Sequence, residues 1–232
     1  MIKRALLMLG VVSIASTASA QVSVGYPPQA SPYRDLEYHQ ELTAFGGYFN
    51  AAKDPAGVAP KAAAIAGVRY EVGVGGPMQL VARFAKTFSE RNVIDPTKPA
   101  DERNLGSESW PVYFGDVGLS LNLTGQRSWH GVVPVTYLGA GLVSDLGKKA
   151  DPDPYRLGTT FAISYSAGLR FVPGGRFQVR VDAGSYMYQI KYPAAYYIKA
   201  SDETQVLADT QDKSFWKRNG VYTLGISYFL FR

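Results

Sequence analysis

Eight segments of alternating polarity most constrain the fold of this chain. In each segment apolar side chains recur at every second residue, which is the period of a β-strand. The segments are residues 36–49, 63–74, 79–88, 112–124, 131–143, 159–171, 176–188 and 220–232. The fifth segment is apolar on both faces, so its orientation stays open. The pattern predicts an all-β chain.

The connections between these segments are alternately long and short. The short ones are GGPM, GQRSWH and VPGG, whereas the long ones include residues 89–111 and 189–219. Barrels of the Gram-negative outer membrane have short periplasmic turns, long outer loops and an even number of strands. Soluble sandwiches have no reason to gather every long loop at one end. The pattern therefore predicts an eight-stranded antiparallel up-and-down transmembrane β-barrel over residues 36–232.

The first twenty residues, MIKRALLMLGVVSIASTASA, have the features of a secretory signal peptide. Two basic residues come first, a short apolar run follows, and Ala-Ser-Ala forms the cleavage site. Residues 21–35 hold three prolines and little periodicity, so they are expected to form a loose periplasmic segment before the barrel.

Composition excludes several classes of function. Lys and Arg number 24 against 19 Asp and Glu, a mild excess that does not suggest a nucleic-acid partner. The absence of Cys excludes disulfides and thiolate metal sites. After residue 20 no apolar run has the length of a membrane helix. We expect no cofactor and no bound metal.

The polar face of the predicted strands carries balanced charge. If the apolar face meets lipid, the polar face lines the lumen, which inverts the arrangement of a soluble barrel. Eight charged residues then point inward: Glu41, Arg69, Glu71, Arg83, Asp116, Arg170, Arg180 and Asp182. Buried charges are costly unless paired, so four positive and four negative groups favour an ion-pair plug. A proton or ion path is the alternative.

Aromatic residues mark two further candidate regions. A cluster in the last long connection is a candidate contact for an extracellular ligand or cell-surface partner: Tyr192, Tyr196, Tyr197, Phe215 and Trp216. Strand extension and interfacial anchoring are the alternatives, and residues 201–210 are expected to form one short helix. Other aromatics near strand ends are expected in membrane-interface girdles, with core packing as the rival: Tyr48, Phe49, Phe88, Tyr113, Trp129, Phe171, Tyr188 and Phe231.

The two histidines do not favour an enzyme. His39 shares a strand face with Glu37 and Glu41, where a metal site is conceivable but a hydrogen-bond network is the simpler interpretation. His130 lies in a short turn. Barrel hydrolases of the outer membrane place a histidine at the outer rim, and both of these fall at the other end. We expect no catalytic residue.

The chain ends with GVYTLGISYFLFR. This ending and the loop pattern resemble the small eight-stranded outer-membrane barrels, of the OmpA transmembrane domain and OmpX type. The resemblance implies that Thr223, Gly225, Tyr228 and Leu230 form an insertion signal read by the barrel-insertion machinery. It departs from the family at Arg232, since members usually end on an aromatic residue.

The sequence thus predicts an integral outer-membrane protein, exported by a cleaved signal peptide, with a structural or surface-interaction role. Outer-membrane lipid and the insertion machinery are the expected partners. A narrow channel for small solutes is the first alternative. A soluble periplasmic lipid-binding barrel is the second, and it requires the face of Val117, Leu119, Leu121 and Leu123 to point inward.

Overall fold

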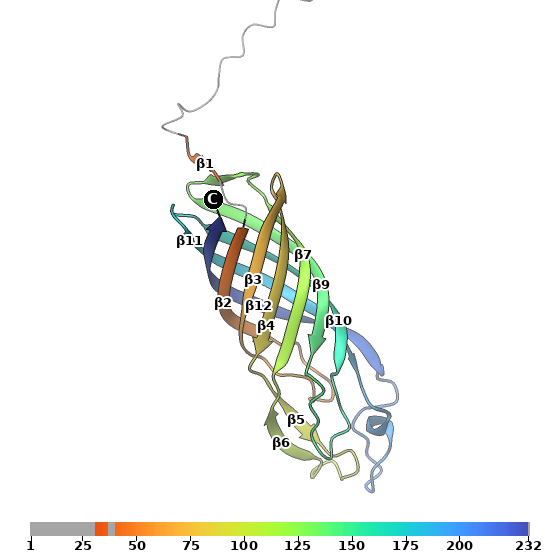
Figure 1. Ribbon diagram of the computed structural model, residues 1–232. Helices are drawn as coiled ribbons and strands as arrows, with labels where there is room; N and C mark the ends of the chain where they lie inside the picture. Colours follow the sequence, from red (N-terminus) through yellow and green to blue (C-terminus); the bar gives the residue numbers. More distant parts are fainter. Residues whose placement is uncertain (1–30, 37–39, 232) are drawn as a thin grey trace, which may run out of the picture. The chain divides into compact units, whose positions relative to one another are not determined.

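The computed structural model describes residues 31–36 and 40–231 (Figure 1). The expected signal peptide, with Glu37, His39 and Arg232, lies outside the described residues. All described strands belong to the unit formed by residues 33–232. Of the described residues, none belongs to a helix long and apolar enough to cross a membrane.

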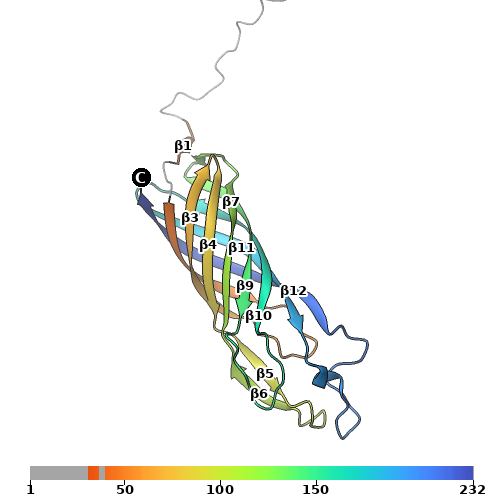
Figure 2. The same cartoon turned by 45° about the vertical axis from the view of Figure 1, so that its right-hand side comes forward.

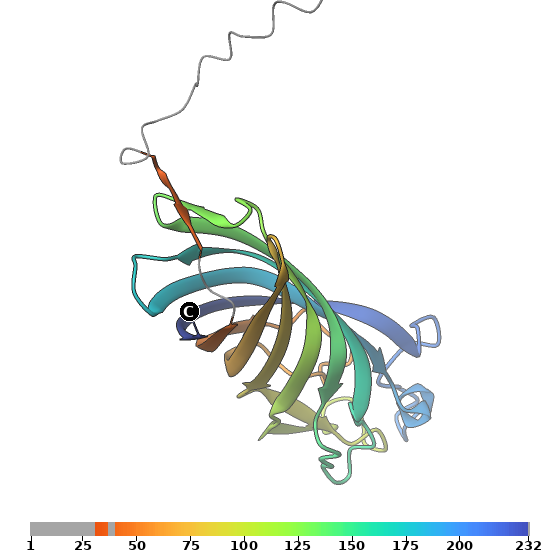
Figure 3. The same ribbon diagram turned by 45° about the horizontal axis from the view of Figure 1, so that its top comes forward.

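Eight long strands form a closed antiparallel barrel. Their order is β2-β3-β4-β7-β9-β10-β11-β12, and pairing of β12 with β2 closes the ring (Figure 3). The strands are β2 (Gln40–Asn50), β3 (Ala63–Gly75), β4 (Met78–Thr87), β7 (Val112–Asn122), β9 (Val132–Ser144), β10 (Thr159–Phe171), β11 (Phe177–Lys191) and β12 (Ser214–Phe231). The prediction of an eight-stranded antiparallel barrel is confirmed.

The apolar face of the strands points outward. On β12, Tyr222, Leu224 and Ile226 are 55%, 58% and 60% exposed, while Ser227 beside them is buried. The same division holds on β7, where the leucines are exposed and Asp116 is buried. A barrel with its apolar faces inward, as the soluble lipid-binding alternative requires, is therefore not the arrangement found.

Strand β9, which the sequence left unoriented, divides in the same way. Val133, Val135 and Tyr137 are buried inside the barrel, and Leu138 and Leu142 are exposed outside it. Both sets are apolar, which is why the alternation of polarity could not assign a face to this segment.

The short turns gather at one end of the barrel, where two short strands extend the barrel sheet beside β9 (Figures 1 and 2). Strand β1 (Tyr33–Asp35) pairs with β8 (Arg127–Trp129), within a segment for which the sequence indicated no regular structure. Beside β1, Leu36 packs against buried valines of the barrel mouth, Val133, Val135 and Val172.

The long connections fold into compact structure at the other end (Figure 2). We call residues 51–62, 88–111, 145–158 and 192–213 the loop cap. It contains the hairpin of β5 (Glu90–Ile94) and β6 (Asn104–Ser109) and the single turn η2 (Ala194–Tyr197). The helix expected over residues 201–210 is wrong, because that stretch forms turns and bends.

Strands β11 and β12 extend beyond the other strands as a two-stranded arm. Pairing continues to Lys191 and Ser214, although the sequence placed residues 189–219 in a loop. That expectation was wrong because β12 continues through Phe215 and Trp216 into a polar stretch. In that stretch no apolar face distinguishes the strand from the neighbouring loop.

Candidate functional site: the lumen charge network and the loop cap

The structure brings all eight predicted lumen charges together inside the barrel. None of these side chains is more than 10% exposed. Alternation along β2, β3, β4, β7, β10 and β11 turns every one of them inward. They form three linked groups along the lumen.

The central group joins two arginines to two carboxylates. Arg180 Nη1 lies 3.0 Å from Glu71 Oε2, and Arg180 Nε donates to Asp182 Oδ2 at 2.7 Å. Arg69 Nη1 reaches the same Asp182 oxygen at 3.4 Å. Each carboxylate therefore contacts both arginines, since Arg69 is also 3.9 Å from Glu71.

Toward the short turns, Arg170 forms the second group. Its Nη2 pairs with Glu41 Oε2, and its other nitrogens donate to Gln178 and Asn122, each at 3.2 Å. Amide side chains thus satisfy the guanidinium where no second carboxylate is present, as buried charge requires.

Toward the loop cap, Arg83 and Asp116 form the third group. Arg83 Nε donates to Asp116 Oδ1 at 2.9 Å, and Ser164 donates to the other carboxylate oxygen at 2.5 Å. The Arg83 guanidinium lies 4.0 Å from the ring centre of Tyr137 and 5.3 Å from that of Tyr186. Cation–π contact adds to the ion pair in holding this arginine.

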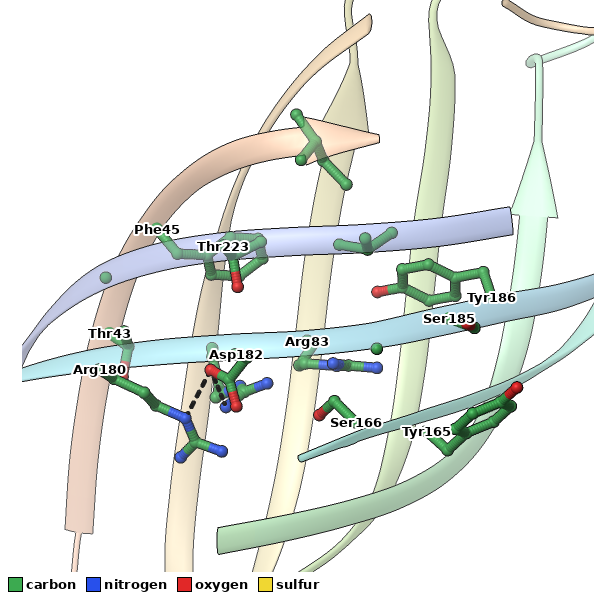
Figure 4. A pocket seen from close by; sticks show the side chains of 15 residues that line it. Thr43, Phe45, Arg83, Tyr165, Ser166, Arg180, Asp182, Ser185, Tyr186 and Thr223 are labelled. Carbon is green, nitrogen blue, oxygen red and sulfur yellow. Dashed lines mark hydrogen bonds and ion pairs between the residues drawn. The ribbon is translucent and has the colours of Figure 1, made fainter. Parts of the chain in front are cut away.

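Little space remains beside the central group. The cavity there measures about 20 Å³, which is room for roughly one water molecule (Figure 4). A larger cavity of about 290 Å³ lies at the short-turn mouth, lined by Leu36, Gln79, Asn122, Gln126 and Arg170 among others.

An aromatic layer separates the charge network from the loop cap. Phe114 lies 4.5 Å from Tyr186 and 5.6 Å from Phe49 between ring centres, and Tyr188 adjoins it at 6.3 Å. The prediction of Phe49 and Tyr188 as interface aromatics was wrong, because they share the inward parity of the charged residues on their strands. Four of the other predicted girdle residues are exposed: Tyr48, Phe88, Trp129 and Phe171.

In the loop cap, Asp153 connects three of the four long connections. Its carboxylate accepts hydrogen bonds from Arg91 Nη1 at 2.6 Å, from the backbone N–H of Ile94 at 3.1 Å and from Tyr196 Oη at 2.6 Å. Arg91 also lies 4.0 Å from the ring centre of Trp110. The sequence analysis missed these residues, since loops carry no periodicity that marks a buried position.

Asp54 does the same for the first and last connections. It accepts from the backbone N–H groups of Val58 and Ala59 at 2.6 and 2.7 Å, and from the hydroxyl of Tyr192. All four connections are thereby tied to one another through two carboxylates.

These bonds correct the predicted aromatic contact surface. Tyr192 and Tyr196 are 7% and 0% exposed, because their hydroxyls bond to carboxylates inside the loop cap, so neither presents a surface to a partner. Tyr197 and Phe215 are half-buried. Only Trp216, 49% exposed on the outer face of β12, is open to contact.

The predicted insertion-signal residues lie on β12 in two orientations. Thr223 and Gly225 belong to the inward face, and Tyr228 and Leu230 to the outward one. Concerning metals, no group of three His, Cys, Asp or Glu among the described residues is placed to hold an ion. The predicted metal alternative at Glu37 and His39 lies outside those residues.

Comparison with known proteins bears on the fold alone. No protein-family model matches the sequence, and no curated protein matches it. Among solved structures, the outer membrane protein OprG of Pseudomonas aeruginosa matches with a TM-score of 0.50 and 12% identity over 83% of this chain and 97% of that one. This chain has the fold of the small outer-membrane barrels.

Two further matches are weaker. Neisserial surface protein A gives a TM-score of 0.46 at 11% identity, covering 82% of this chain and 97% of its own. Ail of Yersinia pestis, in complex with the heparin analogue sucrose octasulfate, gives 0.39 at 14% identity, covering 82% and 98%. The predicted resemblance is confirmed for the fold by the closed eight-stranded barrel and the match to OprG.

Proposed function

We propose that this chain is an integral outer-membrane protein whose lumen is plugged by the charge network and whose loop cap supplies a surface outside the cell. The single observation that carries the proposal is the inversion of polarity around the whole ring. All eight barrel strands expose apolar side chains outward, and all of them except β9 bury polar or charged side chains inward. That is the arrangement lipid demands and water penalises.

The height of the apolar face supports the membrane assignment. On β12 the outward residues run from Tyr222 to Leu230. Eight steps of about 3.3 Å on a strand tilted about 40° rise roughly 20 Å, close to the apolar band of about 25 Å in outer-membrane barrels.

A plug suits the lumen better than a channel. The carboxylates and guanidiniums are paired inside the lumen, some of them across it, and the free volume beside the central group is about one water. The aromatic layer lies between this network and the loop cap. The role that follows is structural or interactive, and the loop cap is the candidate surface for an extracellular partner. Export by a cleaved signal peptide and recognition of Thr223, Gly225, Tyr228 and Leu230 by the insertion machinery belong to the same proposal.

Two measurements test it. Protein from a membrane fraction should run at different positions on an SDS gel before and after boiling, since a closed barrel resists SDS until heated. In planar bilayers the purified protein should give no conductance steps, and Asp116→Asn should leave the trace unchanged. A soluble periplasmic protein with no gel shift would refute the membrane assignment, and steps that change with Asp116→Asn would identify a channel instead.

A further inference from the structure

We propose that the outer face of β10, β11 and β12, at the end near the loop cap, binds a phosphate-bearing lipid headgroup of the outer leaflet, with Arg218 as its principal ligand. This inference rests on the proposed function, because it requires the barrel to stand in a membrane. It adds a specific lipid site to a wall that is mostly apolar.

Arg218 is exposed on the outward face of β12, and residues of β11 and β10 hold its side chain in place. Its Nε donates to Ser185 Oγ on β11 at 3.1 Å, and its guanidinium lies 5.6 Å from the ring centre of Tyr165 on β10. Among the described residues, Ser185 is the one hydrogen-bond partner of the Arg218 side chain. The two terminal nitrogens of Arg218 therefore remain available as a pair of donors. A fixed guanidinium with two free donors suits bidentate recognition of a phosphate.

The depth of Arg218 places it at the headgroup level. The apolar run on β12 that spans roughly 20 Å begins at Tyr222, and Arg218 lies two outward positions above it. An arginine at mid-membrane would cost about 2–4 kcal/mol, but at the interface the cost falls to about 0–1 kcal/mol. The charge of Arg218 is therefore tolerated at this depth, which is the depth of the anionic headgroups.

Aromatic side chains flank the arginine as expected for an interface. Trp216 is the next outward residue on β12, and its ring centre lies 6.4 Å from that of Phe161 on β10. Tyr165 lies on the other side. Amphipathic rings of this kind favour the boundary between acyl chains and headgroups.

The charge of this face selects an anion. Along β10, β11 and β12 no outward position among the described residues is acidic, and the arm adds a second exposed cation at Lys191. Arg180, Glu71 and Asp182 are turned into the lumen and paired there, and the outward cation Lys86 lies on another part of the wall, on β4, against Phe88 and Tyr113. A phosphate at Arg218 therefore meets attraction without a competing carboxylate on the same face.

The test uses the full barrel in detergent micelles and follows the temperature at which the fast-migrating unboiled form is lost. Because a ligand that binds only the folded state stabilises it, diphosphorylated lipid A should raise this midpoint, and its dephosphorylated form should not. In Arg218→Gln, about ten times more lipid A should be needed for the same rise. Ser185→Ala should need about two to three times more, since the arginine keeps its charge but loses its anchor.

Arg156→Gln is the matched control, since Arg156 is an exposed arginine of the loop cap away from the barrel wall. It should respond to lipid A as the native chain does. An unchanged response in Arg218→Gln, or equal responses to the two lipids, overturns the lipid site while the folded barrel stands. A chain without any heat-sensitive form refutes the proposed function and this inference with it.

Discussion

Glu41 and Glu71 lie directly opposite each other in the register of β2 and β3, yet each carboxylate pairs with an arginine from across the lumen. Those arginines, Arg170 and Arg180, are themselves opposite each other on β10 and β11. Like charges at directly opposite positions of neighbouring strands repel. These neighbours in the sheet thus destabilise each other, and the pairs Glu41–Arg170 and Glu71–Arg180 across the lumen offset that repulsion, together with Asp182 and Arg69 on the same strands as Arg180 and Glu71.

Removal of one carboxylate from this arrangement should be costly. In Glu71→Gln, Arg180 keeps only Asp182, and Arg69 loses one of its two acidic neighbours. An incompletely paired buried charge should lower the free energy of unfolding by about 3–5 kcal/mol. Urea unfolding of the refolded barrel in micelles measures this.

The matched variant is Glu108→Gln, whose pair with Lys148 is 42% and 35% exposed at the two side chains. An exposed pair contributes about 0–1 kcal/mol, so the change should be small. Equal effects in the two variants would contradict the role given to the lumen network.

Gly139→Ala should displace Tyr137 from Arg83. A Cβ at Gly139 would lie 2.0 Å from the Tyr137 hydroxyl oxygen and 2.8 Å from the carbonyl oxygen of Val117, so the ring must move. Overpacking of this kind costs about 1–3 kcal/mol. Gly115→Ala is the control, because a Cβ there meets nothing within 4 Å. The prediction fails if urea unfolding ranks the two variants alike.

Asp153→Asn should loosen the loop cap without opening the barrel. The neutral amide leaves Arg91 without its buried counter-charge and offers one acceptor oxygen in place of two. Trypsin should then cut the cap of the native protein, and the heat-induced gel shift should keep its midpoint. Asp209→Asn, at an exposed loop position, should stay resistant. Loss of the gel shift itself would show that cap and barrel unfold as one unit.

Alkaline pH should open the loop cap. Burial raises the pKa of Tyr196, and the hydrogen bond to Asp153 raises it further; burial also raises the pKa of Tyr155. A folded-state pKa above the usual value of about 10 means that the unfolded chain releases its proton first. The stabilisation is therefore complete below about pH 10 and is lost as the pH rises through the folded pKa.

Trypsin accessibility of the cap, followed from pH 8 to about pH 11, measures this loss. Tyr196→Phe removes the ionisable hydroxyl and should flatten the pH dependence, although the cap starts less stable because Asp153 loses a donor. A pH profile unchanged by Tyr196→Phe would exclude this tyrosine as the titrating group.

Much of the barrel could be predicted from the sequence because a strand has a period of two and lipid rewards strict alternation. On that basis residues 159–171 were placed with the bounds that β10 has in the structure. The same parity turned Arg69 and Asp182 inward. Their pairing was beyond prediction, since it depends on which strands face each other across the closed ring.

The loop cap illustrates what periodicity cannot supply. Tyr192 and Tyr196 were expected to face a partner because aromatic residues in loops are often exposed at contacts. They are buried because Asp54 and Asp153, far away in sequence, accept hydrogen bonds from their hydroxyls. No local signal marks such a bond, since the partners lie in loops or, for Tyr196, in the single turn η2.

The like charges at opposite positions of neighbouring strands also disfavour a wrong strand register while the barrel assembles. A β2–β3 hairpin alone carries two adjacent carboxylates, and a β10–β11 hairpin alone carries two adjacent arginines. The charge of each hairpin is neutralised by the other only when the ring closes and Glu41 and Glu71 meet Arg170 and Arg180. A slip of one residue in either would turn its charges toward lipid, so a wrongly registered barrel would hold unpaired charges against the membrane.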